Sequence, residues 1–239
     1  MIRRGATTSG SRTRLANERT NRMRFQFVIA GIIGLMSMAN AQTPAKRDLK
    51  LRGDRFKPLT YDQLTPEQKT MAENLLAGER GGLNGPFNVL LRSPEMGDAA
   101  QKLGAQLRFH SVLPGKLREL AIIITARYWT AQYEWTAHRQ LALKAGVSPA
   151  IADAIAAGKK PASLEPDEEI VYNFCNELLK TKQVSDATFK AAVDKLGERG
   201  VVDLTGLVGY YNFVSMILNL DRYPLPEGAK PELPPLREH

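Results

Sequence analysis

Residues 117–146 read LRELAIIITARYWTAQYEWTAHRQLALKAG, and apolar side chains recur at helical spacing in their first half. Leu117, Leu120, Ile124 and Tyr128 form one stripe, and neighbouring apolar residues widen it until little polar surface remains. A helix of this kind belongs deep in a hydrophobic core. The sequence therefore predicts that this stretch is the centre around which the rest of the chain packs.

Four ionisable side chains interrupt this apolar stretch, namely Glu119, Arg127, Glu134 and His138. Burying an unpaired charge is costly, so they form either a buried ion-pair network or a reactive pocket with shifted pKa values. Glu134 and His138 are four residues apart and share one helix face. Glu119 would face them if its helix packs antiparallel to theirs. Arg127 follows Glu119 by two turns, close to the same face, and would neutralise Glu119 or bind a substrate carboxylate.

The N-terminal 41 residues are typical of a secretory signal peptide with an N-terminal extension. A basic segment ending at Arg24 precedes an apolar run over residues 25–38, and the small residues Ala39, Asn40 and Ala41 follow. The run has about 14 residues, whereas a transmembrane helix needs roughly 20. We therefore expect a periplasmic or secreted protein whose start is Met1 or Met23; the alternative is an uncleaved membrane anchor.

Most of the positive charge lies in this targeting segment. Residues 1–41 carry a net charge of +6, which leaves about +2 of the formal +8 for the mature chain. Nucleic-acid binding is not expected, because it needs a basic face on the folded domain. The single cysteine, Cys175, lies in an apolar helical run and is predicted to be a packed small residue rather than a nucleophile.

Signals for helix starts and ends divide the mature chain into three parts: an extended lead-in over residues 42–60, a helical domain over residues 61–223 and a proline-rich tail over residues 224–239. Thr65 and Gln68 have the spacing of a capping box, and Pro66 fits the first position of the helix that they open. No alternating strand pattern is found, so an all-α fold is predicted. Similar signals predict further helices that start near residues 94, 117, 149, 166 and 186, with an apolar helix over residues 201–220 at the end.

Three segments, RELAI at 118–122, YEWTAH at 133–138 and LALKAG at 141–146, resemble the carboxymuconolactone decarboxylase family. The resemblance extends weakly from about Leu64 to Tyr223. It implies an all-α, alkylhydroperoxidase D-like helical bundle that assembles through apolar helices into a trimer or hexamer. We expect the final apolar helix to lie near the subunit interface, where Gly206 and Gly209 would permit close backbone approach.

The family includes a decarboxylase of aromatic catabolism and the alkylhydroperoxidase D type of thiol peroxidase. The peroxidase branch uses a Cys-x-x-Cys pair, whose positions fall here on Ala131 and Glu134. Neither residue supplies a thiolate or a resolving thiol, so disulfide-based peroxidase chemistry is disfavoured. Glu119 and His138 match the glutamate and histidine of that branch in spacing, while Glu134 matches the decarboxylase-like Tyr-Glu-Trp-x-x-His pattern.

The resemblance therefore implies an exported carboxy-lyase that acts on a small carboxylated or lactone substrate. By hypothesis His138 protonates carbon, Glu134 orients it or raises its pKa, Glu119 shuttles protons and Arg127 binds substrate. The alternative is a non-catalytic exported helical oligomer with an internal ion-pair network. We expect no metal, no cofactor and no membrane contact after signal cleavage. The sequence does not identify the substrate.

Overall fold

The computed structural model describes residues 48–235, so the predicted signal peptide lies outside the described residues. Over that range the protein consists of helices without a strand, which confirms the all-α prediction. The elements are η1 (Tyr61–Gln63), α1 (Pro66–Ala77), α2 (Phe87–Leu90), α3 (Pro94–Phe109), α4 (Gly115–Tyr128), α5 (Gln132–Lys144), α6 (Pro149–Ala156), α7 (Pro166–Thr181) and α8 (Asp186–Asp221).

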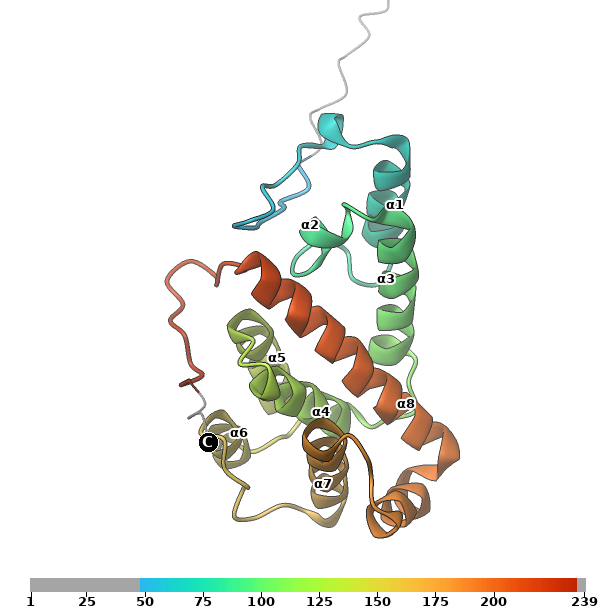
Figure 1. Ribbon diagram of the computed structural model, residues 1–239, viewed down its shortest axis with the longest axis vertical. Coiled ribbons are helices and arrows are strands. Elements are labelled where there is room, and N and C mark those ends of the chain that lie inside the picture. Colours follow the sequence, from blue (N-terminus) through green and yellow to red (C-terminus); the bar gives the residue numbers. More distant parts are fainter. Residues whose placement is uncertain (1–47, 236–239) are drawn as a thin grey trace, which may run out of the picture. The chain divides into compact units, whose positions relative to one another are not determined.

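Helix α4 is the centre of the fold, as its apolar pattern predicts. It packs against α5, α6, α7 and α8, and every side chain from Leu120 to Arg127 is buried (Figure 1). The connection to α5 is only three residues long and includes Thr130, whose φ of 46° lies in the left-handed region. This short turn brings α5 back against α4, and the two helices carry the predicted reactive side chains.

The capping signals place helix starts where the sequence predicts them. Thr65 Oγ1 accepts a hydrogen bond from the backbone N–H of Gln68, and Gln68 Oε1 accepts one from the N–H of Thr65. At the starts of α6 and α8, the hydroxyl groups of Ser148 and Ser185 accept hydrogen bonds from the backbone N–H groups of Ile151 and Thr188. These bonds satisfy backbone donors that have no partner within the helix.

Helix α8 joins two helices that the sequence predicts separately. Gly197, with φ of 71° and ψ of 166°, interrupts the helical backbone at the predicted boundary. Among the described residues, α8 alone is long and apolar enough to cross a membrane, but 56% of its most apolar window is buried inside the protein. Packing against α3, α4, α5 and α7 accounts for much of its apolar character.

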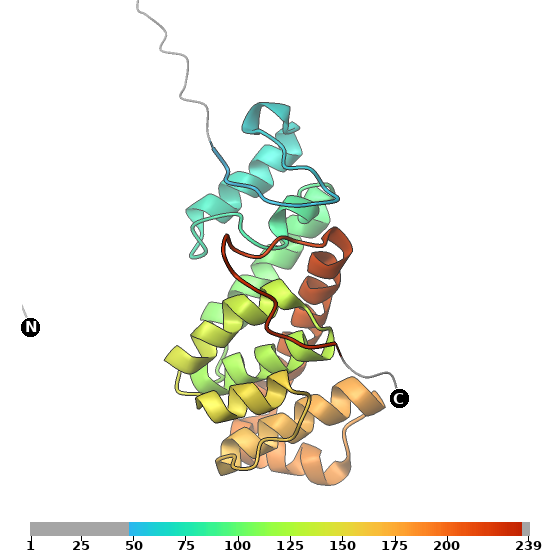
Figure 2. The ribbon, with the colours of Figure 1, turned by 90° about the vertical axis from the view of Figure 1, so that its left-hand side faces the viewer.

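A second, smaller core lies where α1, α2 and the lead-in meet the end of α8. Leu49 is buried there together with Ile217. The backbone N–H of Phe56 donates to Asp221 Oδ1 over 2.7 Å, and Arg52 donates to the carbonyl of Pro224 over 3.2 Å. The lead-in is thus fixed to the far end of the chain. Figure 2 shows this part of the chain beside α1 and α2.

The proline-rich tail lies along α5. Gln132 donates to the carbonyl of Leu233 over 2.7 Å and accepts from its N–H over 3.1 Å, while the Leu233 side chain is buried. The hydroxyl of Tyr223, just before the tail, accepts a hydrogen bond from the backbone N–H of Gly85 over 3.1 Å. Both contacts hold segments that border the cavity described next.

Candidate active site

Helices α4 and α5 bring Glu119, Glu134 and His138 into one buried cluster. His138 Nδ1 lies 2.7 Å from Glu119 Oε2, and His138 Nε2 lies 3.1 Å from Glu134 Oε1. The imidazole therefore stands between two carboxylates. None of the three residues is more than 5% exposed, so water screens these charges poorly. The juxtaposition expected from the sequence is present in the structure.

The two carboxylates determine the charge of His138. Burial alone would lower the pKa of the imidazole. The negative charges of Glu134 and Glu119, and the hydrogen bonds to both, outweigh burial and raise the pKa of His138 to about 9. At neutral pH both ring nitrogens of His138 then carry a proton. Each N–H can then donate to one carboxylate, and both N–O distances are consistent with this arrangement.

Tyr211 of α8 covers one side of this cluster. Its ring packs edge-on to the His138 ring, with centroids 5.1 Å apart and planes at 78°. Burial raises the pKa of Tyr211 well above its usual value, and the nearby charge of Glu134 adds to this effect. The phenol therefore remains neutral and forms a fixed wall beside the imidazole.

A cavity of about 300 Å³ reaches His138 and Glu134. Glu119 does not line it, because it lies on the opposite side of the imidazole. The cavity walls come from the glycine-rich loop before α2, from the first residue of α2 and from α3, α5 and α8. They comprise Arg80, Gly81, Gly82, Asn84, Gly85, Pro86, Phe87, Arg108, Tyr133, Glu134, Ala137, His138, Leu141, Tyr210, Tyr211 and Val214.

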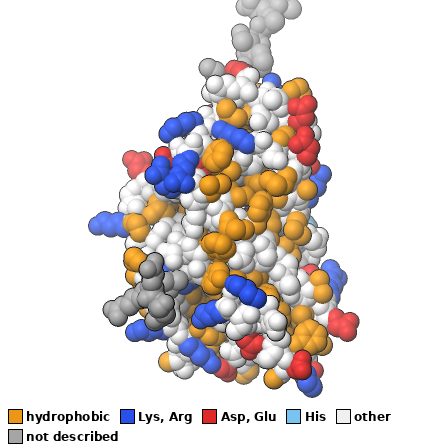
Figure 3. All heavy atoms as spheres, in the orientation of Figure 1, with side chains coloured by type: hydrophobic (Ala, Val, Ile, Leu, Met, Phe, Trp, Pro, Cys, Tyr) orange, Lys and Arg blue, Asp and Glu red, His pale blue; other side chains and the backbone are white. Residues whose placement is uncertain are grey.

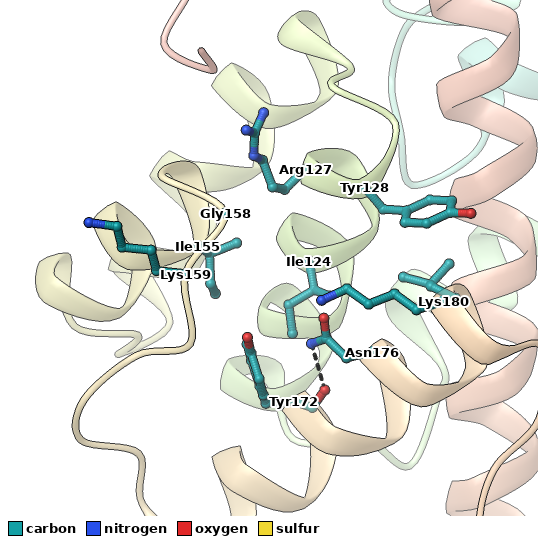
Figure 4. Close-up of a pocket in the computed structure, with 10 residues that line it drawn as sticks. Ile124, Arg127, Tyr128, Ile155, Gly158, Lys159, Tyr172, Asn176 and Lys180 are labelled. Atoms are coloured by element: carbon teal, nitrogen blue, oxygen red, sulfur yellow. Dashed lines mark hydrogen bonds between the residues drawn. The ribbon is translucent and has the colours of Figure 1, made fainter. Parts of the chain in front are cut away.

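The structure does not bring Arg127 to this cavity. Its Nη1 donates to the carbonyl of Pro234 over 2.8 Å, and the residue lines a second cavity of about 90 Å³ between α4, α6 and α7 (Figure 4). The expectation that Arg127 shares a face with Glu119 was wrong, because eight residues of helix leave it about 80° around the axis. Glu119 instead pairs with His138 and lies 3.9 Å from Arg118 Nε.

One family matches this part of the chain. Residues 94–169 match the Carboxymuconolactone decarboxylase family. The matched segment runs from the first residue of α3 into the first turn of α7 and contains the whole Glu119, Glu134 and His138 cluster. A comparison with curated proteins found no match. The family match confirms the resemblance seen in the sequence and indicates a decarboxylase or alkylhydroperoxidase-like function.

Within the carboxymuconolactone decarboxylase family, the thiol-peroxidase branch needs a reactive cysteine pair. Cys175 of α7 is fully buried, and burial raises the pKa of its thiol far above neutral pH. It is not among the residues that line the cavity with His138. Cys175 is therefore a packed residue, as predicted from the apolar run around it. Among residues 48–235, no group of His, Cys, Asp and Glu side chains is arranged to hold a metal ion.

Among the cavity residues that the sequence did not indicate, Arg80, Arg108 and Tyr211 matter most for its chemistry. Arg80 and Tyr211 lie outside the segment that matches the carboxymuconolactone decarboxylase family. The one available signal was the loop at residues 81–86 (GGLNGP), which directly follows Arg80. No periodicity links that loop to α5, so its position over His138 could not be read from the sequence.

Proposed function

We propose that this protein is an exported carboxymuconolactone decarboxylase-like carboxy-lyase that acts on a small carboxylated or lactone substrate by acid–base chemistry. The observation that carries the proposal is a histidine, held between two carboxylates, at the wall of a cavity large enough for a small molecule. A pKa of about 9 keeps His138 charged at neutral pH while leaving its proton transferable.

In the proposed reaction the bond between the substrate and its carboxylate carbon breaks. Its electron pair moves into the unsaturated or carbonyl system of the substrate, and the carboxylate leaves as neutral CO₂. His138 then gives a proton to carbon, so a new C–H bond forms and the imidazole becomes neutral. A proton from solvent restores the imidazolium. One proton is consumed for each CO₂ released, and no redox partner is needed.

We propose that the two glutamates exchange the roles suggested by the sequence. Glu134 lines the cavity and faces His138 Nε2, so it is placed to pass a proton between solvent and the ring. Glu119 lies outside the cavity, against His138 Nδ1, where it fixes the orientation of the ring and stabilises its charge. Glu119 is thus a positioning residue rather than a proton shuttle.

Replacing Glu119 with glutamine is expected to change the pH profile more than substrate binding. The substitution removes one of the charges that raise the pKa of His138, so the pH at which kcat falls moves down by about one unit. KM remains near the wild-type value, because residue 119 does not line the cavity. Steady-state kinetics from pH 6 to pH 10 would measure both. An unchanged pH profile would contradict the positioning role.

The cavity distinguishes this proposal from the non-catalytic alternative. A scaffold needs the ion pairs of the cluster but no space beside them, whereas an enzyme needs both. Peroxide reduction is less well supported, because Ala131 and Glu134 occupy the cysteine positions. The test is a screen of the purified protein for CO₂ release from small unsaturated lactone acids and for peroxide reduction. CO₂ release supports the proposal; peroxide reduction alone, or neither activity, contradicts it.

We also propose that the chain forms a homo-oligomer through α8 and α3. Figure 3 shows hydrophobic side chains gathered along the face over α8. Val202 is 70% exposed, and Gly209 has open space around it. Gly206, in contrast, packs against Leu107 of α3 within the chain. The other large exposed apolar side chains of these helices are Met96, Leu103, Phe189, Met216 and Leu220, of which Phe189 lies before the break at Gly197.

Light scattering on the purified protein is expected to give a trimer or a multiple of it. An apolar face of this kind is rarely left open on a soluble monomer. A charged residue on this face, Val202→Glu, is expected to shift the particle toward monomer. Ala150→Glu, at an exposed residue of α6 away from α3 and α8, serves as the comparison and is expected to leave the particle size unchanged. A monodisperse wild-type particle of monomer mass at micromolar concentration would contradict the proposal.

A further inference from the structure

Two arginines line the cavity beside His138 without a carboxylate partner. Within the described residues, neither Arg80 nor Arg108 forms an ion pair, although both border the cavity. The Nε and Nη2 atoms of Arg80 are buried and have no hydrogen-bond partner. Arg80 as a whole is half-buried, but buried N–H groups without a hydrogen-bond partner are costly. A partner from outside the chain would satisfy them.

Aromatic rings and one glycine hold the two guanidinium groups in place. Arg80 lies over the rings of Phe87 and Phe109, at 5.3 Å and 5.9 Å from their centroids, and Arg108 lies 5.4 Å from the centroid of Phe109. A side chain at residue 104 would place its Cβ only 2.6 Å from Arg80 Nη2 and would also collide with Tyr210. Gly104 on α3 thus leaves the space that Arg80 and Tyr210 occupy.

The balance of charge in the cavity favours an anion. Protonated His138 is offset by Glu134 on its cavity side and by Glu119 behind it. Arg80 and Arg108 add two positive charges that no acidic side chain of residues 48–235 offsets within 4.0 Å, so the described part of the site carries a net positive charge. A planar guanidinium suits a carboxylate, because it donates two parallel hydrogen bonds.

We propose that Arg80 and Arg108 form a subsite for a carboxylate that the substrate keeps throughout the reaction. The carboxylate that leaves becomes neutral CO₂, so two cations bound to it would stabilise the bound substrate more than the transition state. A carboxylate retained in the product keeps the same contacts from beginning to end. The arginines then orient the substrate while His138 meets the reacting carbon, and the substrate carries at least two acidic groups. This second point rests on the proposed decarboxylation; the anion subsite itself does not.

Equilibrium binding tests the subsite without any turnover. Furan-2-carboxylate and furan-2-carboxamide are flat rings of the same size that differ in charge, so each is titrated into the full protein by calorimetry or NMR. The acid is expected to bind at least about 10-fold more tightly than the amide. Arg80→Gln and Arg108→Gln are each expected to weaken binding of the acid by about 10- to 100-fold, the range for a hydrogen bond to a charged group, and to leave the amide unaffected.

A control variant separates this site from the second cationic cavity. Lys180 is exposed, lines the cavity that contains Arg127, and forms no ion pair among the described residues. Lys180→Gln removes the same charge and is expected to leave binding of the acid unchanged. Because Arg80 and Arg108 have no ion-pair partner, their Gln variants should also melt within about 4 °C of the wild type, and Arg80→Lys should recover part of the affinity.

Each outcome bears on the proposal in one direction. Equal binding of acid and amide, wild-type affinity in both arginine variants, loss of binding in Lys180→Gln, or no binding of the acid at about 10 mM would overturn it. Arginine-dependent binding by a protein that releases no CO₂ would keep the subsite and reject the proposed decarboxylation. Decarboxylation with an unchanged KM in both arginine variants would keep the proposed decarboxylation and reject the anion subsite.

Discussion

Replacing His138 with glutamine is expected to lower kcat by at least about 100-fold, the lower end of what general acid catalysis contributes. Glutamine retains an N–H that can donate to one of the two neighbouring carboxylates, but it carries no proton that can be transferred to carbon. Binding of substrate should change less than kcat, because the proposed anion subsite lies on Arg80 and Arg108. The measurement is steady-state CO₂ release by the variant and the wild type.

His110 provides the matched control for this substitution. It is exposed at the end of α3, lies 2.6 Å from Glu79 and does not line the cavity, so His110→Gln should retain wild-type kcat. Circular dichroism would establish that both variants are folded. If His138→Gln fails to fold, the wild-type pH profile gives the answer, since kcat should fall as the pH rises through about 9. Undiminished activity in a folded His138→Gln variant would remove His138 from the mechanism.

The stability of the protein is expected to fall between pH 6.5 and pH 9. The pKa of His138 is raised from 6.5 to about 9 in the folded state, so folding takes up a proton within this window. The stabilisation is fully present below pH 6.5 and is lost as the pH rises through about 9. Its size is on the order of 3 kcal/mol, from about 1.4 kcal/mol for each pKa unit.

Urea denaturation of the wild type and His138→Gln across this range would measure the effect. The groups that face the imidazole are Glu119 of α4, Glu134 of α5 and Tyr211 of α8. Burial raises the pKa of Tyr211 well above the window, so its phenol stays neutral throughout. The difference in unfolding free energy between the two proteins should therefore depend on pH in this window. A constant difference would contradict a charged His138.

Local signals in the sequence were sufficient to predict the helices and the cluster of Glu119, Glu134 and His138. The capping box at Thr65 and the apolar pattern of residues 117–128 depend on neighbours along one helix, and both are present as predicted. The position of Glu119 against His138 followed from one further assumption, that two consecutive helices pack against each other. Short connections make that assumption safe.

Features that join distant segments were not predictable in the same way. Arg80 reaches the cavity from a loop, and Tyr211 reaches it from the last helix, so only the tertiary packing of α3, α5 and α8 brings them together. Arg127 was misplaced because a spacing of eight residues only approximates two turns. The covering of α5 by the tail was also not foreseen, since prolines reveal an extended backbone but not the surface that it follows.

The bonds between the lead-in and the tail have a consequence for the order in which the protein folds. Arg52 donates hydrogen bonds to the carbonyl groups of Pro224 and Leu225, more than 170 residues later in the chain. Phe56 donates to Asp221. Closing loops of this length is slow compared with forming a helix pair such as α4 and α5. During folding the central helices can assemble first, whereas the lead-in gains its bonds to residues 221–225 only once the C-terminal end of α8 is in place. The earliest described residues are thus among the last to reach their final positions.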